Sequence, residues 1–526
     1  MTNSHLQDTN SPIAHRKVHV ASIVFLTLII FLAVGLRVYR ANESLWVDEL
    51  HTSWTVSNGV GSVADRAAMG NQSPFYFYMT WCSTSLFGSS ELTIRMPSLV
   101  AGVLLVPLMY VAVFRWTSSF VAALLAGFLV AIDREFIFYA QEARPYAVVQ
   151  LLGLVSVTTF SHLVMASRVK GEKRASSSIV WRILFIISSV LLFYSHYTAG
   201  LLIVAEICCY LVLLTTRELR PAVSWKCFTT DILIVTLLCL PAAPHLIDIA
   251  TRRNDWQGII DAGTTPTLLR IFDTYLLLPT AIVALTSFIS WIQRRRAIFD
   301  RMDFRVLIIL ICWFIVPPGT TWLATVIGTL PVFMFRYVIV SAAAAIALAC
   351  ALTAIVHAKT RWVAGLAVAV GAVWTSGIVQ QLQANGRIIG SRNEDWINVV
   401  RIVNANDDGK SWPVLLQAGL IEDRRLKSDN SELFHDYCLF PITSLYSIDT
   451  SHELVPLPSG CAPDVDELIF DEAGIWLIVR GRADYAKAIA SGFCKNLTKD
   501  QRPCKMHVRF TEGSLHLFEF ASSDDD

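Results

Sequence analysis

The feature that most constrains this chain is a series of apolar runs, spread over residues 18–382. A helix needs about 20 mostly apolar residues to cross the hydrocarbon core of a bilayer, and these runs have that length. Hydrophobic residues make up 54% of the chain and charged residues only 16%, whereas soluble domains are about one quarter charged. We therefore predict a polytopic α-helical membrane protein.

The apolar runs predict about eleven transmembrane helices. The first run follows His15-Arg16-Lys17 and lacks a clear signal-peptidase site, so we interpret it as a retained helix. The expected spans are residues 18–38, 92–114, 118–138, 146–166, 179–196, 198–216, 229–248, 267–292, 305–327, 331–357 and 361–382.

Basic residues predict the orientation of these spans, because short cytoplasmic loops are enriched in Lys and Arg. With eleven spans, all the basic loops fall on one side of the membrane, which we assign to the cytoplasm. They contain Arg16, Arg115, Arg168/Lys170/Lys173/Arg174, Arg217/Arg220/Lys226, Arg294-Arg295-Arg296 and Lys359/Arg361. The N-terminus is then inside. The loop with Asp48, the turn 139–145, the loop 249–266 and everything after residue 383 face outward.

The first outer loop, residues 40–91, has a helical pattern of its own. Segments 48–56 and 74–87 both suit short helices, and the second is dense in aromatic residues from Phe75 to Phe87. Such helices are typical of the membrane interface. An ordinary buried helix explains the same pattern, and both interpretations stay open.

The composition changes near residue 391, which divides the chain into a membrane module, 1–390, and a soluble α/β domain, 391–526. In the second domain we expect a helix from Trp396 and another over 484–490. The strands expected there are 413–416, 467–470 and 475–479, with a terminal hairpin of 507–510 and 515–520.

Four of the 11 cysteines lie in the soluble domain, namely Cys438, Cys461, Cys494 and Cys504. An oxidising compartment favours two bridges there, and closeness in sequence favours Cys438–Cys461 and Cys494–Cys504. Zinc binding is the alternative, although no Cys-x-x-Cys pair occurs.

Several function classes lack support in the sequence. The chain has no P-loop, no dinucleotide fingerprint in a strand-helix context and no His-Glu-x-x-His motif. A net charge of +1 and the lack of a basic, aromatic-interleaved patch give no reason to expect nucleic acid as a partner.

Polar groups that could carry chemistry fall on the outward side of the expected topology. Several of them have a structural alternative. Glu142 and Arg144 could neutralise one another, Arg336 could extend its charged group from a helix end towards water, and His196 could be a hydrogen-bonded structural residue. The candidates are Asp48 and Glu49, the Asn71-Gln72-Ser73-Pro74 segment, the segment from Tyr139 through Gln141, Glu142 and Arg144 to Tyr146, His196-Tyr197, and Arg336-Tyr337.

Taken in order, these motifs resemble the bacterial GT-C glycosyltransferases. The resemblance covers about residues 18–350 and is closest to the protein-mannosyltransferase-like family, which includes protein O-mannosyltransferases and lipid A aminoarabinose transferases. It rests on Leu45-Trp46-Val47-Asp48-Glu49, Ser73-Pro74-Phe75-Tyr76, Phe87-Gly88-x-x-Glu91-Leu92-x-x-Arg95-x-Pro97-Ser98, Tyr139-Ala140-Gln141-Glu142-Ala143-Arg144-Pro145-Tyr146 and, more weakly, Glu394-Asp395-Trp396.

The resemblance implies a polyprenyl-phosphate sugar donor and transfer, on the outer face of the membrane, to a lipid, glycan or protein acceptor. It also implies that Asp48 is catalytic. An attacking hydroxyl needs a base, and a leaving phosphate needs cations, for which Arg144 and Arg336 are our candidates. Glu49 would support Asp48. Gln72, Gln141, Glu142, Tyr146, His196, Tyr197 and Tyr337 are candidate substrate-binding residues. A single base with direct displacement predicts inversion at the sugar carbon.

One departure from the family pattern concerns a metal site. Many relatives have an acid, or an acid and a Lys, just before the loop proline, whereas this chain has Asn71-Gln72-Ser73 before Pro74. A divalent cation (Mg²⁺ or Mn²⁺) held with Glu49 and catalysis without a metal therefore both stay open.

Two other function classes compete with the transferase. A transporter or lipid flippase would also place polar residues at membrane depth, although matching halves with broken spans are not evident. A scaffolding membrane protein that binds partners through its soluble domain is the other alternative.

Overall fold

The computed structural model describes residues 12–165, 173–252, 303–328, 333–355, 361–390, 392–405, 412–427, 431–460, 474–499 and 504–522. The chain folds as two units. Residues 1–40 and 98–390 form the first, which we call the membrane unit. Residues 41–97 and 391–526 form the second, the loop–tail unit.

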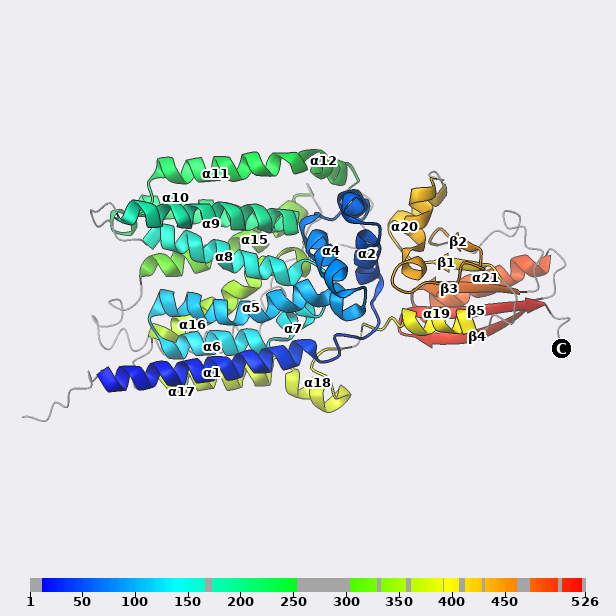
Figure 1. The fold of residues 1–526 in the computed structure, drawn as a ribbon, viewed down its shortest axis with the longest axis horizontal. Helices are drawn as coiled ribbons and strands as arrows, with labels where there is room; N and C mark the ends of the chain where they lie inside the picture. The colour runs from blue at the N-terminus through cyan, green and yellow to red at the C-terminus, as the bar shows by residue number, and fades with distance from the viewer. Residues whose placement is uncertain are drawn as a thin grey trace, which may run out of the picture. The chain divides into compact units, whose positions relative to one another are not determined.

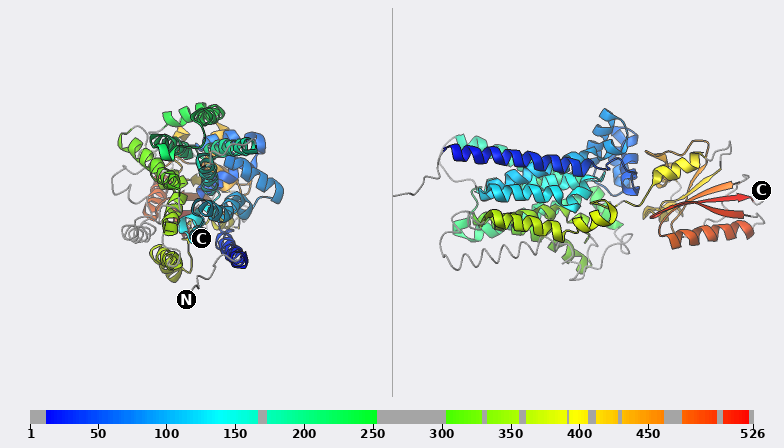
Figure 2. Two further views of the ribbon diagram at one scale, coloured as in Figure 1. Left: turned by 90° about the vertical axis from the view of Figure 1, so that its left-hand side faces the viewer. Right: turned by 90° about the horizontal axis from the view of Figure 1, so that it is seen from below.

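The membrane unit is a bundle of long helices that run side by side (Figure 1). An end-on view shows them as neighbouring rings with no sheet between them (left panel of Figure 2). The helices are α1 (Pro12–Val38), α5 (Glu91–Thr117), α6 (Phe120–Ile132), α7 (Arg134–Ala140), α8 (Tyr146–Met165), α9 (Lys173–Ser195), α10 (Leu201–Thr215), α11 (Trp225–Cys239), α12 (Ala243–Thr251), α15 (Phe304–Val326), α16 (Ala342–Ile355), α17 (Arg361–Thr375) and α18 (Ile378–Asn385). Short 3-10 helices include η2 (Tyr197–Gly200), η6 (Phe335–Tyr337) and η7 (Ile339–Ser341).

The described helices agree with the predicted spans and make this a multi-pass membrane protein. Seven of them are long and apolar enough to cross a membrane, and three shorter apolar helices cover 120–132, 179–195 and 339–355. Together they correspond to ten of the eleven spans. The remaining span, 267–292, lies outside the described residues.

Small residues let the central helices approach closely. Ala343, Ala347 and Ala351 recur every four residues on α16 and are fully buried, as expected where helices pack in a membrane. In contrast, Phe31 on α1 and Trp374 on α17 are each 70% exposed. Large apolar side chains on the outside and small ones inside are the pattern of a helix bundle surrounded by lipid.

The loop–tail unit begins with the short helices of the first outer loop. These are α2 (Val47–Ser57), α3 (Val63–Met69) and α4 (Phe75–Phe87), joined through a 3-10 turn, η1 (Val60–Ser62). The helices α2 and α4 match the two predicted segments, and α3 was not predicted. The ring of His51 packs between aromatic side chains of this loop and the tail, with centroids 5.8 Å from Phe77 and 5.6 Å from Phe440.

The tail contributes a mixed five-stranded sheet in the order β2-β1-β3-β5-β4. Strand β1 is parallel to β2 and β3, whereas β5 is antiparallel to β3 and β4. The view from below shows α19 and α21 on opposite faces of the sheet (right panel of Figure 2). The strands are β1 (Val414–Gln417), β2 (Leu454–Pro456), β3 (Gly474–Arg480), β4 (Cys504–Glu512) and β5 (Leu515–Ser522), and the helices are α19 (Trp396–Ala405), η8 (Glu422–Lys427), α20 (Glu432–Thr443) and α21 (Ala483–Lys499).

Alternation along the strands explains the two covered faces. Leu477, Val479 and Phe518 are buried against α21, where Ala486 and Phe493 complete an apolar cluster. The predicted strands 413–416 and 475–479, the hairpin and both predicted helices are present. The predicted strand 467–470 lies outside the described residues, and β2 and α20 were not predicted.

The structure groups the first outer loop with the tail, whereas the sequence-based division placed that loop in the membrane module. The reason is a set of contacts between residues about 350 positions apart, described below, which local sequence patterns do not reveal. The predicted cysteine bridges stay predictions, because Cys461 and the side chain of Cys504 lie outside what the structure describes.

Candidate functional site

Asp48 and Glu49 form the acidic first turn of α2, which begins at Val47. Trp46 precedes the helix in an extended conformation. Acidic side chains in a first turn interact favourably with the positive end of the helix dipole. The two neighbours have different surroundings, since Glu49 is fully buried and Asp48 is partly exposed.

Glu49 is held by Arg95. The Arg95 Nε donates to Glu49 Oε1 at 2.7 Å and Nη2 donates to Oε2 at 2.5 Å, and both side chains are almost completely buried. The same guanidinium donates to the carbonyl oxygens of Ala41 and Glu43, at 2.9 and 2.7 Å. The pair therefore ties the start of the first loop to α2.

Glu394 of the tail holds the N-terminus of α2. Its Oε2 accepts a hydrogen bond from the backbone N–H of Val47, the first residue of the helix, at 2.9 Å. Its Oε1 accepts from Arg480 Nε at 2.7 Å and from Ser514 Oγ at 3.2 Å. A backbone N–H in the first turn has no partner within its own helix, so a residue 347 positions away provides one.

Two further tail groups bind the segment that precedes Asp48. The backbone N–H of Trp396 donates to Ser44 Oγ at 3.1 Å. The hydroxyl of Tyr446 accepts from the backbone N–H of Leu45 at 2.9 Å and donates to Glu91 at 3.1 Å. Three of the four residues from Ser44 to Val47 are thus anchored to the tail, and so is the approach to Asp48.

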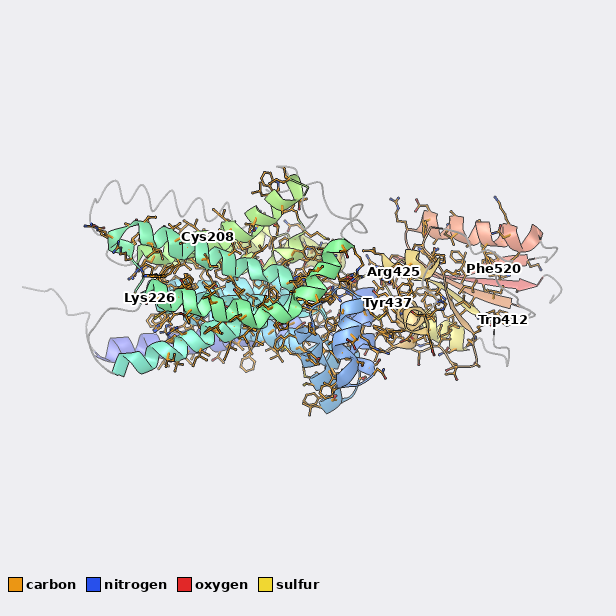
Figure 3. All side chains as sticks on the ribbon, turned by 90° about the horizontal axis from the view of Figure 1, so that it is seen from above. Cys208, Lys226, Trp412, Arg425, Tyr437 and Phe520 are labelled. Atoms are coloured by element: carbon orange, nitrogen blue, oxygen red, sulfur yellow. The ribbon has the colours of Figure 1, made fainter. Side chains whose placement is uncertain are left out.

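The surroundings of Asp48 include the tail helix α20. Burial raises the pKa of the Tyr437 phenol, and the charges of Glu422, Asp423 and Asp48 raise it further. Tyr437 is therefore a protonated donor near a group of acids. Tyr437 stacks against Phe434, over which Arg425 lies. Figure 3 labels Tyr437 and Arg425 in the same region of the tail.

Gln72 and Asn71 are used within the loop–tail unit. Gln72 donates through Nε2 to the carbonyl of Gly70 at 3.1 Å, and Asn71 donates through Nδ2 to Glu422 at 3.3 Å. Asn71 has a φ of 58°, a backbone conformation that Asn tolerates better than most residues. The polar side chains before Pro74 therefore stabilise the local turn and its contact with Glu422 of the tail.

In the membrane unit, Gln141 closes the C-terminal end of α1. Its Nε2 donates to the carbonyl oxygens of Leu36, Arg37 and Tyr39, at 3.1, 3.0 and 2.8 Å. These carbonyls lack partners within their own helix. The Gln141 amide is thus committed to positioning the turn between α7 and α8, in which Glu142 and Arg144 are buried.

An aromatic cluster adjoins this turn. Ring centroids of Tyr139 and Tyr146 are 4.9 Å apart, those of Tyr146 and His196 are 5.9 Å apart, and those of His196 and Tyr337 are 5.4 Å apart. The hydroxyl of Thr198 lies 2.8 Å from His196 Nδ1 and donates to the carbonyl of Tyr337. This contact joins η2 to η6.

Arg144 and Arg336 converge on the same place. Burial lowers the pKa of His196, in the turn between α9 and η2, and the charges of Arg144 and Arg336 lower it further. The ring contacts of His196 with Tyr146 and Tyr337 bring the α7–α8 turn, which carries Arg144, close to η6, which carries Arg336. The Arg336 guanidinium also lies 5.7 Å from the centroid of the Tyr337 ring. Ser98 fixes the backbone of Arg144 by donating to its carbonyl at 2.9 Å.

Tyr197 lies at the edge of this group and contacts a different helix. Its hydroxyl is 2.9 Å from Nδ1 of His245 on α12. The sequence-predicted residues thus form two sets, each within one unit. Asp48, Glu49 and Gln72 belong to the loop–tail unit, and Gln141, Glu142, Arg144, Tyr146, His196, Tyr197, Arg336 and Tyr337 belong to the membrane unit.

The residues that the structure describes do not fit a metal site. Among them, no three His, Cys, Asp or Glu side chains come together as metal ligands. Glu49, the acid suggested as a substitute ligand, is committed to Arg95 through both of its oxygens. We therefore derive no step through a metal ion.

The sequence analysis missed two residues that support the candidate site. Arg95 belongs to the quoted motif that ends at Ser98, but nothing local shows that it pairs with Glu49. Glu394 was noted only as the start of the tail. A charged residue inside an otherwise apolar segment, such as Arg95, is a signal that a buried partner exists.

Part of the chain is similar in sequence to a known family. Residues 71–247 match the family described as dolichyl-phosphate-mannose-protein mannosyltransferase. No curated protein sequence matches the chain.

Solved structures match almost the whole chain at low sequence identity. The apo oligosaccharyltransferase of Archaeoglobus fulgidus has a TM-score of 0.51 and 10% identity, and the match covers 96% of this chain and 75% of that one. The same organism's AglB, in complex with an inhibitory peptide and a dolichol-phosphate, has a TM-score of 0.50 and 11% identity, with 96% and 74% covered.

A third structure, ArnT from Cupriavidus metallidurans bound to undecaprenyl phosphate, has a TM-score of 0.50 and 11% identity, with 96% of this chain and 98% of that chain covered. At such identity the structures show the fold, and the family match adds the sequence relationship over the first loop and the following helices. The chain thus has the fold of these solved transferases, and residues 71–247 match the mannosyltransferase family by sequence.

Proposed function

We propose that this protein transfers one sugar from a polyprenyl-phosphate donor to a hydroxyl acceptor on the outer face of the membrane. The acceptor is a lipid, glycan or protein. The observation that carries the proposal is the pair of ring contacts, Tyr146–His196 and His196–Tyr337, that brings the segments of Arg144 and Arg336 together in the membrane unit. Two guanidinium groups from separate elements suit a phosphate, which each can bind in a bidentate way.

In the proposed reaction, Asp48 is the base. The acceptor oxygen forms a bond to the anomeric carbon while the bond between that carbon and the phosphate oxygen breaks. The acceptor proton passes to the Asp48 carboxylate, and the polyprenyl phosphate leaves with the bonding electrons. Arg144 and Arg336 would stabilise the charge that develops on the leaving phosphate. Direct displacement inverts the sugar carbon.

The surroundings of Asp48 support its role as base and that of Glu49 as a positioning residue. Glu49 is buried and bidentate with Arg95, so its oxygens are occupied, whereas Asp48 is partly exposed on the same turn. Retention through a covalent intermediate would need a second carboxylate near the sugar. The commitment of Glu49 to Arg95 removes the nearest candidate for that second carboxylate.

In the membrane unit, the aromatic side chains of Tyr146 and Tyr337 would line the donor end of the site, with Glu142 positioning Arg144. His196 lies between the two tyrosines, and the low pKa caused by burial and by both arginines keeps its ring neutral. A neutral imidazole adds no competing positive charge and can donate one hydrogen bond. Tyr197 contacts His245 and is better suited to a supporting role.

The fold relatives support the class of ligands. The AglB structure was solved with a dolichol-phosphate and an inhibitory peptide, and the ArnT structure with undecaprenyl phosphate. A lipid phosphate is the chemistry that these two structures share. We infer that this chain also binds a lipid phosphate, with Arg144 and Arg336 as the residues that contact the phosphate.

Reconstitution tests this proposal. The purified protein in proteoliposomes would receive a panel of polyprenyl-phosphate monosaccharides with membrane lipids, glycans and peptides as acceptors, and mass spectrometry would detect products. We expect transfer from at least one donor, with an inverted anomeric configuration by NMR. Movement of the donor across the bilayer without any transfer would favour a flippase instead. Retention of configuration would contradict the single-base mechanism.

A further inference from the structure

We propose that Glu394, at the start of the tail, is a positioning residue for Asp48, so that the tail domain takes part in setting up the chemistry. This inference rests on the proposed function. Glu394 is 7% exposed, and its two oxygens together accept four hydrogen bonds. A buried carboxylate whose two oxygens both accept hydrogen bonds is part of a rigid network.

The contact of Glu394 with α2 lies next to Asp48. Oε2 of Glu394 accepts from the backbone N–H of Val47, the residue directly before Asp48, at 2.9 Å. The same oxygen accepts from Trp396 Nε1 at 3.0 Å. Because backbone N–H groups of the first helical turn lack partners in the helix, this bond determines where α2 begins. The direction of the Asp48 side chain follows from that start.

The other oxygen of Glu394 connects the helix to the sheet. Oε1 accepts from Arg480, at the end of β3, and from Ser514, in the turn between β4 and β5. That turn is also pressed against Asn393, because a Cβ at Gly513 would lie 2.2 Å from the Asn393 carbonyl oxygen. Gly513, with a φ of 57°, is the residue that this close approach requires. The end of the sheet thus holds Glu394 in place.

This network has a specific consequence for catalysis. A displacement of a catalytic group by about 1 Å can cost roughly 100-fold in rate without any change in its chemistry. Loss of the Glu394 contact would let the first turn of α2 fray and move Asp48. The contacts proposed for the donor phosphate, Arg144 and Arg336, belong to the membrane unit and would be unaffected.

The chain offers two matched pairs of variants. Glu394→Gln keeps the size of the side chain but replaces one accepting oxygen by an NH₂ group that faces donors. Its control is Asp395→Asn, because Asp395 is the neighbouring acid and its carboxylate accepts hydrogen bonds from Asn398 of α19. Val47→Pro removes the N–H that donates to Glu394 and replaces the buried Val47 side chain by a ring. Proline is well tolerated at the first position of a helix. The extended Trp46 is compatible with a following proline. Its control is Val47→Ala, which keeps the N–H.

The experiment measures kcat and KM for the donor in proteoliposomes, for the full chain and each variant. We expect Glu394→Gln and Val47→Pro to lower kcat about 10- to 100-fold with KM for the donor within about twofold of wild type. Asp395→Asn and Val47→Ala should keep kcat within about threefold. If either Glu394→Gln or Val47→Pro fails to fold, the other variant and its control provide the test.

A double-mutant cycle separates positioning from a general loss of structure. In the Asp48→Asn background, Glu394→Gln should have almost no further effect on the residual transfer, because the group that it positions has already lost its function. The same fold loss in both backgrounds would overturn the inference, as would a wild-type kcat for both Glu394→Gln and Val47→Pro. Absence of transfer by the wild type would refute the proposed function, an outcome distinct from these.

Discussion

Glu49 and Arg95 form a buried bidentate ion pair, with nitrogen–oxygen distances of 2.7 and 2.5 Å, that joins the first turn of α2 to the start of α5. Arg95 also binds backbone carbonyls of the segment that leads from α1 into α2. Of the two adjacent acids in the Asp-Glu motif, one is thus structural. The other acid, Asp48, is partly exposed on the same helical turn.

The first prediction concerns this pair. Arg95→Met should lower the free energy of unfolding of the loop–tail unit by up to about 3 to 5 kcal/mol, because the buried Glu49 carboxylate loses its bidentate partner and keeps the longer ion pair with Arg392, at 3.7 Å. Thermal unfolding in detergent, followed by tryptophan fluorescence, measures the loss. Arg482→Ala is the control, since Arg482 and its partner Asp484 are 88% and 72% exposed and such pairs contribute less than about 1 kcal/mol. Equal losses for both variants would contradict the structural role of Arg95.

A second prediction concerns the donor phosphate. Arg336→Ala should weaken donor binding roughly 10- to 100-fold, as expected for the loss of a charge-assisted hydrogen bond. Arg336→Lys should recover only part of the affinity, because Lys lacks the planar fork. Binding of a fluorescent polyprenyl phosphate measures the effect. Arg217→Ala, which removes an exposed arginine in the short 3-10 helix after α10, is the control. A similar weakening of donor binding in that variant would exclude a specific site.

The third prediction is a pH dependence of stability. Burial raises the pKa of Asp423 from 3.8 to about 7. A carboxyl whose pKa is raised in the folded state contributes stability that is fully present below its unfolded pKa and is lost as the pH rises through the folded value. The wild type should therefore lose stability between about pH 4 and pH 8, by up to about 4 kcal/mol.

Asp423→Asn should remove this dependence, since the amide stays neutral and keeps an oxygen for the Leu420 N–H. The difference in melting temperature between variant and wild type, measured at several pH values, is the test. Asp449→Asn removes an exposed acid of the same unit and should leave the pH dependence as it is. A pH-independent difference for Asp423→Asn would show that Asp423 is ionised in the folded protein.

A fourth prediction is the orientation in the membrane. The basic loops predict an N-terminus inside and a C-terminus outside, and Figure 3 places Lys226, of one such loop, at one end of the bundle. A reporter that works only in the cytoplasm should stay silent when fused after Asp526. The same reporter inserted after Arg220, in a predicted cytoplasmic loop, should be active. Activity of the reporter after Asp526 would contradict the predicted number of eleven spans. The predicted position of Asp48 on the outer side of the membrane would then lose its support.

Hydropathy and local pattern predicted much of this fold, because span length and strand alternation are set by neighbouring residues. Val414–Gln417 and Gly474–Arg480 lie within one residue of their predicted strands at both ends. Helices α2 and α4 of the first loop follow in the same way, whereas α3 was not predicted. Strand β2, only three residues long, has too little pattern to be predicted.

The contacts that build the candidate site depend on distant partners and were not predictable from one sequence. Glu394 and Val47 are 347 positions apart, and Gln141 binds carbonyls 102 to 105 positions away. Gln141 was therefore expected to contact substrate, although its amide closes α1. The motifs predict which segments carry the candidate residues. The different surroundings of Asp48, which is partly exposed, and Glu49, which is buried, are visible in the structure and not in the sequence.

The most direct test of the account is sugar transfer by Asp48→Asn in reconstituted membranes, with donor binding measured separately. The change keeps size and hydrogen bonding but removes the base, so transfer should fall about 100- to 10,000-fold while donor binding stays unchanged. Asp65→Asn, which alters an exposed acid on α3 of the same loop, should transfer at the wild-type rate. Near-normal transfer by Asp48→Asn would contradict the assignment of Asp48 as the base.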